Sequence, residues 1–486
     1  MDITTSSNKF NAKKTVENIA QEIKKELTEQ ADIDLGGVDI VGLTAMISEE
    51  KIKQFDDAEY PSMKEILPKL ISGNDNQSFI VNDIGAVIRQ YRLWKEKLPG
   101  VGIFYAVKCN SDPILLKTLY CLGVSFDVAS EGEISLVTDL DPKRERRDKI
   151  IYANPCKDIE HIKFARSQQI SMMTFDNIIE LLKIKLFHPD AELVLRILVD
   201  DSKSKMPFGS KFGCPMNDIK NVLVYAKFLE LNVTGVSFHV GSCCIDASAY
   251  SDAIKRAKTV FDIAKDVGFN FNFLDVGGGM SNSNKQGEIT FDQIAIEINR
   301  ELKDSFGSHE NLRVIAEPGR FFAASTFTLV VSIIGKKLII KNDTYNVDPT
   351  SKKRKRHEED TNSMNKKPHI DEESSDMILD DDINKEHKVF HYTINSSIYG
   401  MFNNIIFDKA VPEFKLLNEY NDKKYKSVLF GQTCDSADTI VTGICIPELA
   451  CGDKLYVEDH GAYTSSSAAP KFNGFKPPVI IPIFTY

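Results

Sequence analysis

Eight short apolar runs recur between residues 102 and 316, each separated from the next by a longer amphipathic segment. Runs of this length predict strands, and spacers with helical periodicity predict helices. Eight such units in succession predict a (β/α)₈ barrel, also called a TIM barrel. The predicted strands are Gly102–Val107, Ser125–Val128, Ile150–Ala153, Ser171–Phe175, Glu192–Leu198, Gly235–Val240, Phe271–Val276 and Arg313–Ala316.

A barrel of this kind carries its chemistry on residues just past the carboxyl ends of its strands. In this chain those positions are rich in acids, bases and glycine, as the rim of an active site should be. They are Lys108, Asp127, Asn154, Asp176, Asp200, His239, Gly277 and Glu317.

The rest of the chain predicts a second domain and two charged segments. Strand-like runs after residue 389 predict an all-β domain, so we expect an α/β plus β architecture. We expect residues 1–40 to form a disordered extension with a helical stretch at Thr15–Gln30, and residues 41–83 to contribute to the β-domain. The barrel should span 84–323 and the C-terminal β-domain 324–486. Residues 341–388 have the charge blocks of a disordered insertion, and their basic run Lys352–Arg356 is either a nuclear localisation signal or a solvated charge run.

Charge and cysteine content exclude several classes of function. The net charge of −10 over 486 residues disfavours nucleic acid as a partner, because phosphate binding needs a basic surface. No apolar run approaches membrane-spanning length, and the polar amino terminus lacks a signal-peptide core, which predicts a cytoplasmic protein. The nine cysteines are then reduced thiols, and their scattered spacing predicts no metal site.

Lys108 ends the apolar stretch Phe104–Val107. A lysine at the end of a buried strand loses water, which lowers its pKa toward the neutral amine that imine chemistry requires. The alternative is a lysine that only reaches from the strand to the solvent.

Glycines and ionic residues follow the last two barrel strands. Gly277, Gly278 and Gly279 let the backbone approach a ligand closely and offer N–H groups to a phosphate. In the segment Ala316–Arg320, Arg320 suits a phosphate contact and Glu317 suits a pyridinium nitrogen, although the two could instead form an ion pair with each other.

Two further groups have side chains suited to catalysis. His239 could stack on a planar cofactor, and Ser242 could donate to a phosphate. In the second domain, Cys434 could donate a proton, and Asp435 could pair with an ammonium group.

These motifs occur in one order, together with YANPCK at 152–157, MMTFD at 172–176, LVLRI at 193–197 and GAYT at 461–464. As a set, from about residue 77 onward and outside the charged insertion, they closely resemble the eukaryotic ornithine decarboxylase family, whose fold is alanine racemase-like. The resemblance implies pyridoxal 5'-phosphate-dependent conversion of L-ornithine to putrescine and CO₂, the first step of polyamine biosynthesis. It also implies a head-to-tail homodimer with shared active sites, and antizyme as a further partner. Because the chain stops at Tyr486 without the family's destabilising tail, we do not expect antizyme-driven turnover.

The resemblance assigns roles residue by residue. Lys108 forms the imine with the cofactor, His239 stacks on its ring, and Glu317 pairs with its pyridine nitrogen. Cys434 of the partner subunit returns a proton to Cα. The other cofactor-binding residues are Asp127, Glu133, Ser242, Gly277, Gly278, Gly279, Pro318, Gly319, Arg320 and Tyr463, and the substrate-binding residues are Phe407, Asp408 and Asp435.

The chain departs from the family pattern at several positions. Phe407 replaces a tyrosine, Cys243 a glycine, Ser396-Ser397 an Asp-Gly pair, and Met280–Asn282 a Phe-Pro-Gly run. Two rival functions remain open. One is decarboxylation of diaminopimelate, arginine or lysine, although Asp435 stands where diaminopimelate decarboxylases typically carry glutamate. The other is an antizyme-inhibitor-like regulator, which should have lost catalytic residues that are present here.

Overall fold

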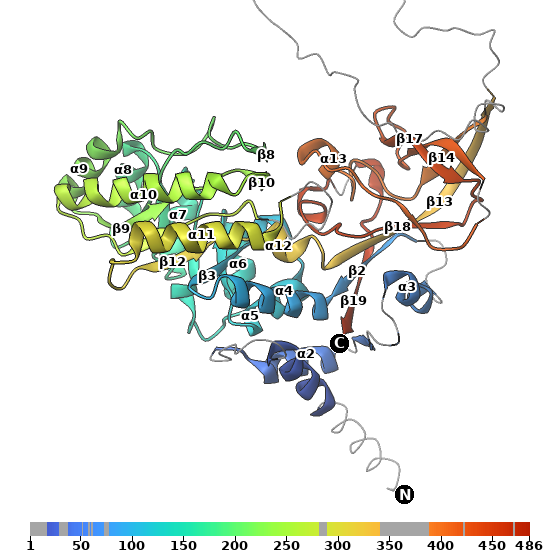
Figure 1. Ribbon diagram of the computed structural model, residues 1–486, viewed down its shortest axis with the longest axis horizontal. Coiled ribbons are helices and arrows are strands. Elements are labelled where there is room, and N and C mark those ends of the chain that lie inside the picture. Colours follow the sequence, from blue (N-terminus) through green and yellow to red (C-terminus); the bar gives the residue numbers. More distant parts are fainter. Residues whose placement is uncertain are drawn as a thin grey trace, which may run out of the picture.

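The computed structural model describes residues 17–28, 37–50, 52–56, 59, 62–71, 77–280, 289–340, 388–420, 423–469 and 472–486. Eight parallel strands close into a barrel in the order β11-β12-β3-β4-β5-β6-β7-β9 (Figure 1). Each of the eight predicted runs overlaps one of these strands, so the predicted barrel is confirmed. The strands are β3 (Val101–Ala106), β4 (Ser125–Val128), β5 (Ile150–Tyr152), β6 (Met172–Phe175), β7 (Glu192–Arg196), β9 (Asn232–Ser237), β11 (Phe273–Asp275) and β12 (Arg313–Ala316).

Helices between the strands cover the outside of the barrel. They are α4 (Ile84–Lys97), α5 (Pro113–Cys121), α6 (Glu131–Asp139), α7 (Ile159–Ser167), α8 (Ile178–Phe187), α9 (Ile219–Phe228), α10 (Ser248–Val267), α11 (Phe291–Phe306) and the short α12 (Arg320–Ala323). A two-stranded ribbon of β8 (Ser204–Met206) and β10 (Ser242–Cys244) projects from the barrel. None of the helices in the described ranges is long and apolar enough to cross a membrane.

A nine-stranded sheet forms the second unit, as the predicted α/β plus β fold class requires. Its main path is β1-β19-β2-β13-β14-β16-β17, and β18 pairs with both β13 and β15. The long β13 follows the barrel in the chain and pairs with β2, β18 and β14 within the sheet (Figure 1). The strands are β1 (Lys53–Phe55), β2 (Phe79–Asp83), β13 (Phe327–Ile340), β14 (Lys388–Ile394), β15 (Lys415–Leu416), β16 (Lys424–Phe430), β17 (Thr439–Pro447), β18 (Lys454–Val457) and β19 (Val479–Thr485).

The chain before the barrel is more ordered than expected. Residues 17–28 form a helix, and Ile19, Ile23 and Leu27 are buried in the main hydrophobic core. The expected disorder of 1–40 is therefore wrong for this helix, because its apolar residues recur at helical spacing and find a surface to cover. Helices α2 (Ile40–Glu49) and α3 (Met63–Ile71) follow. The rest of the expected extension, 1–16 and 29–36, lies outside the described residues, as do 341–387 with the basic run Lys352–Arg356.

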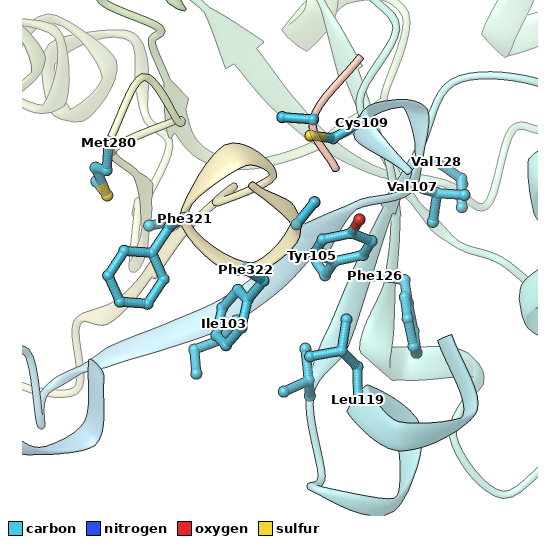
Figure 2. Packing of buried hydrophobic residues seen from close by; sticks show 14 of the residues in the cluster. Ile103, Tyr105, Val107, Cys109, Leu119, Phe126, Val128, Met280, Phe321 and Phe322 are labelled. Carbon is cyan, nitrogen blue, oxygen red and sulfur yellow. The ribbon is translucent and has the colours of Figure 1, made fainter. Parts of the chain in front are cut away.

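Two apolar layers support the carboxyl end of β3. Outside the barrel, Ile103 and Tyr105 lie near Phe321 and Phe322 of α12 (Figure 2), and the rings of Tyr105 and Phe322 meet edge to face with centroids 6.3 Å apart. Inside the barrel, a separate buried cluster fills the interior: Phe104, Ile151, Ala153, Met172, Val194, Phe273 and Ile315. Because side chains alternate along a strand, the residues two positions further along each barrel strand face the same interior and lie directly above this cluster.

Candidate active site

A cavity of about 380 Å³ opens at the carboxyl end of the barrel. Barrel residues supply most of its wall, and residues after β13 close it. The lining residues are Lys108, Ala129, Ala153, Asn154, Pro155, Arg196, Met206, Phe208, Phe212, His239, Ser242, Glu317, Phe407, Asp408, Tyr463 and Ser467. The cavity thus gathers many of the residues that the strand-end rule and the motifs single out.

Lys108 lies in a turn of 3₁₀ helix, η1 (Val107–Cys109), directly after β3. Its Nζ donates a hydrogen bond of 2.6 Å to Oδ2 of Asp127, a buried residue of the neighbouring strand β4. Desolvation lowers the pKa of Lys108, but the carboxylates of Asp127 and Glu317 outweigh it and hold the pKa above its ordinary value. The expected neutral amine is therefore wrong for this state, because the sequence does not reveal a carboxylate within reach.

Glu133 fixes the loop behind this ion pair. Ser130 caps α6 by accepting the Glu133 N–H at 3.3 Å, and the Glu133 carboxylate accepts the Ala129 N–H at 2.7 Å. Burial raises the pKa of Glu133, and nearby Asp127 adds to the effect. The Glu133 side chain therefore braces the segment that follows Asp127.

His239 lines the cavity, and Gly277 and Gly278 pack directly against it, where a larger residue would collide. Gly277 and Gly279 have φ of +66° and +93°, and a Cβ at Gly277 would come within 2.2 Å of the Phe238 carbonyl oxygen. His239 Nδ1 accepts the Gly241 N–H at 3.0 Å. Burial, followed by the charges of Arg196 and Lys108, holds the pKa of His239 well below its usual value. The ring is therefore neutral, with a planar surface beside the glycines.

Glu317 is a buried carboxyl group that follows β12. Its N–H donates to the Gly277 carbonyl at 2.8 Å, which ties it to the glycine run. Within the described residues, no donor reaches its buried Oε1. Burial first, and then the charges of Asp275 and Asp127, raise the pKa of Glu317 well above its ordinary value.

Arg320 begins α12 and reaches across to the second unit. Its Nη2 donates to both carboxylate oxygens of Asp408 at 2.7 Å and to Ser242 Oγ at 3.2 Å. The guanidinium carbon lies 5.2 Å from the centroid of the Tyr463 ring. The ion pair left open by the sequence therefore forms with Asp408 and not with Glu317.

Pro318 and Gly319 hold this segment against the lysine turn. The Pro318 carbonyl accepts the Ala106 N–H at 3.2 Å. A Cβ at Gly319 would lie 2.7 Å from that of Cys109, so a larger residue would push α12 away from Lys108.

Of the remaining predicted residues, Phe407 reaches the cavity, whereas Cys434 and Asp435 do not. Phe407, at the end of α13 (Asn404–Phe407), lines it but is 62% exposed. Cys434 is exposed, and its N–H donates to Asn473 Oδ1 at 3.4 Å. Asp435 accepts a hydrogen bond of 2.6 Å from the Tyr399 hydroxyl. Neither Cys434 nor Asp435 lines the cavity of its own chain.

Sequence reasoning missed Arg196 and Asp275. The predicted strand Glu192–Leu198 runs two residues beyond β7, so the strand-end rule pointed to exposed Asp200 and passed over Arg196, which lines the cavity. Asp275 is the last residue of β11, and the rule pointed to Gly277. An inward-facing charge at the last position of a barrel strand was the available signal in both cases. Asp176 also lies outside the cavity lining, where it accepts the Gly213 N–H at 2.9 Å.

Two of the departures from the family pattern can be understood from the backbone. Cys243 has φ of +53°, a conformation that favours glycine. Ser397 Oγ accepts the Gly400 N–H at 3.0 Å, and Ser396 and Ser397 are both buried. Both changes are therefore accommodated without loss of the local fold.

The residues present fit pyridoxal 5'-phosphate. Glu317 Oε1 and Arg320 Nε are buried and have no hydrogen-bond partner among the described residues, which are the features expected of groups that contact a ring nitrogen and an anion. The glycine run supplies backbone surface where any side chain would collide. His239, whose ring is neutral, lines the same cavity as Glu317.

Comparisons with known proteins agree with this site. The family model "Pyridoxal-dependent decarboxylase, pyridoxal binding domain" matches residues 84–324. A probable ornithine decarboxylase of Dictyostelium discoideum is 40% identical over 90% of this chain and 85% of its own. Ornithine decarboxylase of Mus musculus is 40% identical over 86% of this chain and 84% of its own, and antizyme inhibitor 2 of Xenopus laevis is 40% identical over 85% and 82%.

Among solved structures, an arginine decarboxylase of Paramecium bursaria Chlorella virus matches with a TM-score of 0.73 and 33% identity, over 87% of this chain and 100% of that chain. A lysine/ornithine decarboxylase of Vibrio vulnificus, complexed with putrescine, matches with a TM-score of 0.70 and 29% identity, over 87% and 99%. The barrel, the carboxylate-bound lysine and the relatives agree, and the chain belongs to the ornithine decarboxylase family of pyridoxal-dependent decarboxylases.

Proposed function

We propose that the protein decarboxylates L-ornithine to putrescine and CO₂, with pyridoxal 5'-phosphate as cofactor. The observation that carries the proposal is the arrangement of Lys108 against buried Asp127, together with the buried carboxyl group of Glu317, whose Oε1 no donor among the described residues reaches. A regulator without activity would have no need to retain this costly set of buried charges.

When bound, pyridoxal phosphate withdraws electrons from the bond between Cα and the carboxylate. Lys108 would hold the cofactor covalently, and Asp127 orients the amine through its 2.6 Å contact. Glu317 would hold a proton at the ring nitrogen, and the glycine run with Ser242 and Arg320 would bind the phosphate. The apolar side chains Met206, Phe208 and Phe212 would exclude water from the reacting carboxylate.

We further propose that a second copy of the chain completes the site. The Cys434 loop is firmly built although its thiol is exposed, because Asp438 accepts hydrogen bonds from the Thr433 N–H and hydroxyl at 3.0 and 2.6 Å. Tyr399, which holds Asp435, stacks on Phe472 with centroids 3.9 Å apart. An ordered loop that presents a thiol and a carboxylate outside its own cavity suits delivery to a partner subunit. There Cys434 would give a proton to Cα, and Asp435 would face the distal ammonium.

A substrate panel tests the proposal. Purified protein with pyridoxal phosphate should release CO₂ fastest from L-ornithine, and more slowly from lysine, arginine and diaminopimelate. The expected preference follows from the carboxylates Asp408 and Asp435, which match a short side chain that ends in an ammonium group. Faster release from arginine or lysine would reassign the substrate, and no release from any of the four would refute the decarboxylase proposal.

The similarity to antizyme inhibitor 2 makes a non-enzymatic regulator the second candidate function. This candidate predicts no CO₂ release and no absorption from lysine-bound cofactor, so the same assay separates the two. Antizyme binding and a cytoplasmic location, both expected from the sequence, stay predictions.

A further inference from the structure

Three carboxyl groups lie together above the apolar interior of the barrel. Asp275 on β11 stands opposite Ile315 on β12 in the strand register. Because side chains two residues apart share one face, Glu317 follows Ile315 on the same inward side. Asp127 occupies the corresponding position on β4, opposite Ile151.

The local cations do not neutralise all three groups. Lys108 is engaged by Asp127 at 2.6 Å, and Arg196 on β7 is the other cation that acts on Asp275 and Glu317. The neutral ring of His239 faces the same region from the end of β9. Three ionised carboxylates against two cations would leave a net negative charge buried, which is costly.

Asp275 and Glu317 each bury a carboxyl oxygen that has no donor among the described residues. Asp275 is fully buried, and its Oδ1 accepts the Gly277 N–H at 2.8 Å. Within the described residues, no donor reaches Asp275 Oδ2 or Glu317 Oε1. The two groups belong to adjacent strands, β11 and the end of β12, and face the same inward side. A hydrogen bond between two such carboxyl groups forms only when one of them carries a proton.

The electrostatics agree with the geometry. Burial raises the pKa of Asp275 to about 7, more than the Gly277 N–H and Arg196 lower it. Burial and the charges of Asp275 and Asp127 raise the pKa of Glu317, against the opposing effects of Lys108 and Arg196. Two acids that interact this closely titrate as a pair.

We propose that Asp275 and Glu317 share one proton at neutral pH, and that Asp275 is a positioning residue that sets the protonation of Glu317. The shared proton is a property of the chain alone. Its role toward the ring nitrogen of the cofactor rests on the proposed function. The test therefore uses the full-length chain without cofactor and does not depend on activity.

Infrared spectroscopy tests the shared proton directly. Wild-type protein should show the C=O band of a protonated carboxyl group at neutral pH, and this band should disappear as the pH rises through the pair's titration. Asp275→Asn keeps an oxygen for the Gly277 N–H but removes the acid, so the band should be lost at neutral pH, as it should in Glu317→Gln. Asp176→Asn, outside the cavity, is the matched control and should leave the band unchanged.

Thermal unfolding gives an independent readout. When folding raises the pKa of a carboxyl group, the free energy of unfolding decreases as the pH rises from the pKa in the unfolded state, about 4, to the pKa in the folded state. Asp275→Asn should therefore gain melting temperature relative to wild type between about pH 6 and about pH 8. The double variant Asp275→Asn/Glu317→Gln should gain little more melting temperature than Asp275→Asn, because both substitutions remove the same shared proton.

Three results would overturn the proposal. They are absence of the band in wild-type protein at neutral pH, persistence of the band in both single variants, and additive pH-dependent gains in the double variant. If Asp275→Asn does not fold, the infrared band still tests the shared proton, because its titration in wild-type protein and its loss in Glu317→Gln are measured without the Asp275→Asn variant.

Discussion

Arg320 donates to both carboxylate oxygens of Asp408, at 2.7 Å each, across the boundary between the barrel and the second unit. Both side chains are largely buried, so solvent screens the pair little. Arg320 is the residue that we expect to bind the cofactor phosphate, and Asp408 the one that we expect to face the substrate ammonium. Each group therefore has to leave the other before it can take up its proposed ligand.

Asp408→Asn should tighten binding of pyridoxal phosphate, because it releases the Arg320 guanidinium from a competing anion. A charge-assisted hydrogen bond contributes ~1.5–3 kcal/mol, so the affinity should rise about tenfold or more. Titration followed by absorbance measures this, with pyridoxal as the comparison ligand, because pyridoxal has no phosphate and should gain nothing. Asp190→Asn, in the exposed pair with Arg166, is the control. An equal gain for both ligands would contradict the explanation.

Asp127→Asn should lower the pKa of Lys108, because the Asp127 carboxylate is the largest influence that raises it. Loss of one adjacent opposite charge lowers a lysine pKa by about 1–3 units. The pH dependence of Lys108 modification by pyridoxal phosphate, trapped with borohydride and mapped by mass spectrometry, reports the change. Asp176→Asn should leave the midpoint where it is, and an unchanged midpoint in Asp127→Asn would refute the role of the ion pair.

Mixing Lys108→Ala with Cys434→Ala should restore part of the activity that each variant lacks. If each site takes Lys108 from one subunit and Cys434 from the other, random reassociation gives about a quarter of wild-type CO₂ release. The control is each variant mixed with itself, which should recover nothing. Failure to recover activity in mixtures shown to contain heterodimers would argue against a shared site.

His460→Gln should make the protein less sensitive to acid. His460 is buried, with Nε2 2.9 Å from the Met401 carbonyl, and burial lowers its pKa to about 4. The unfolded chain takes up the proton near pH ~6.5 and the folded chain only near the lower value. Stability therefore falls as the pH drops through this window, by up to ~3 kcal/mol.

Denaturant unfolding at several pH values measures that slope, which should flatten in His460→Gln. Partly exposed His161, beside Glu131, provides the control variant His161→Gln, whose slope should match wild type. An acid slope retained in His460→Gln would assign it to other groups.

The barrel could be predicted because each strand carries its own local signal. Short apolar runs such as Ser125–Val128 must be buried on both sides, and eight of them with helical spacers leave few alternatives. The ends of the runs carried a weaker signal, and an error of two residues at Leu198 was enough to hide Arg196. The helical stretch at Thr15–Gln30 was predicted, but the packing of residues 17–28 in the core was not, since the apolar residues of such a helix are buried only when another surface covers them.

The ordered motifs around Lys108, the glycine run and Arg320 were by themselves sufficient to indicate the family and the cofactor. Only the tertiary structure decided which charges meet. Arg320 pairs with Asp408, although the two are distant in sequence. Asp127 lies beside Lys108, and Asp275 lies on the same inward side as Glu317, because their strands are adjacent in the closed barrel. A pKa depends on distance and burial, and these are set by the fold, so the protonation of Lys108 and Glu317 could not be read from the chain alone.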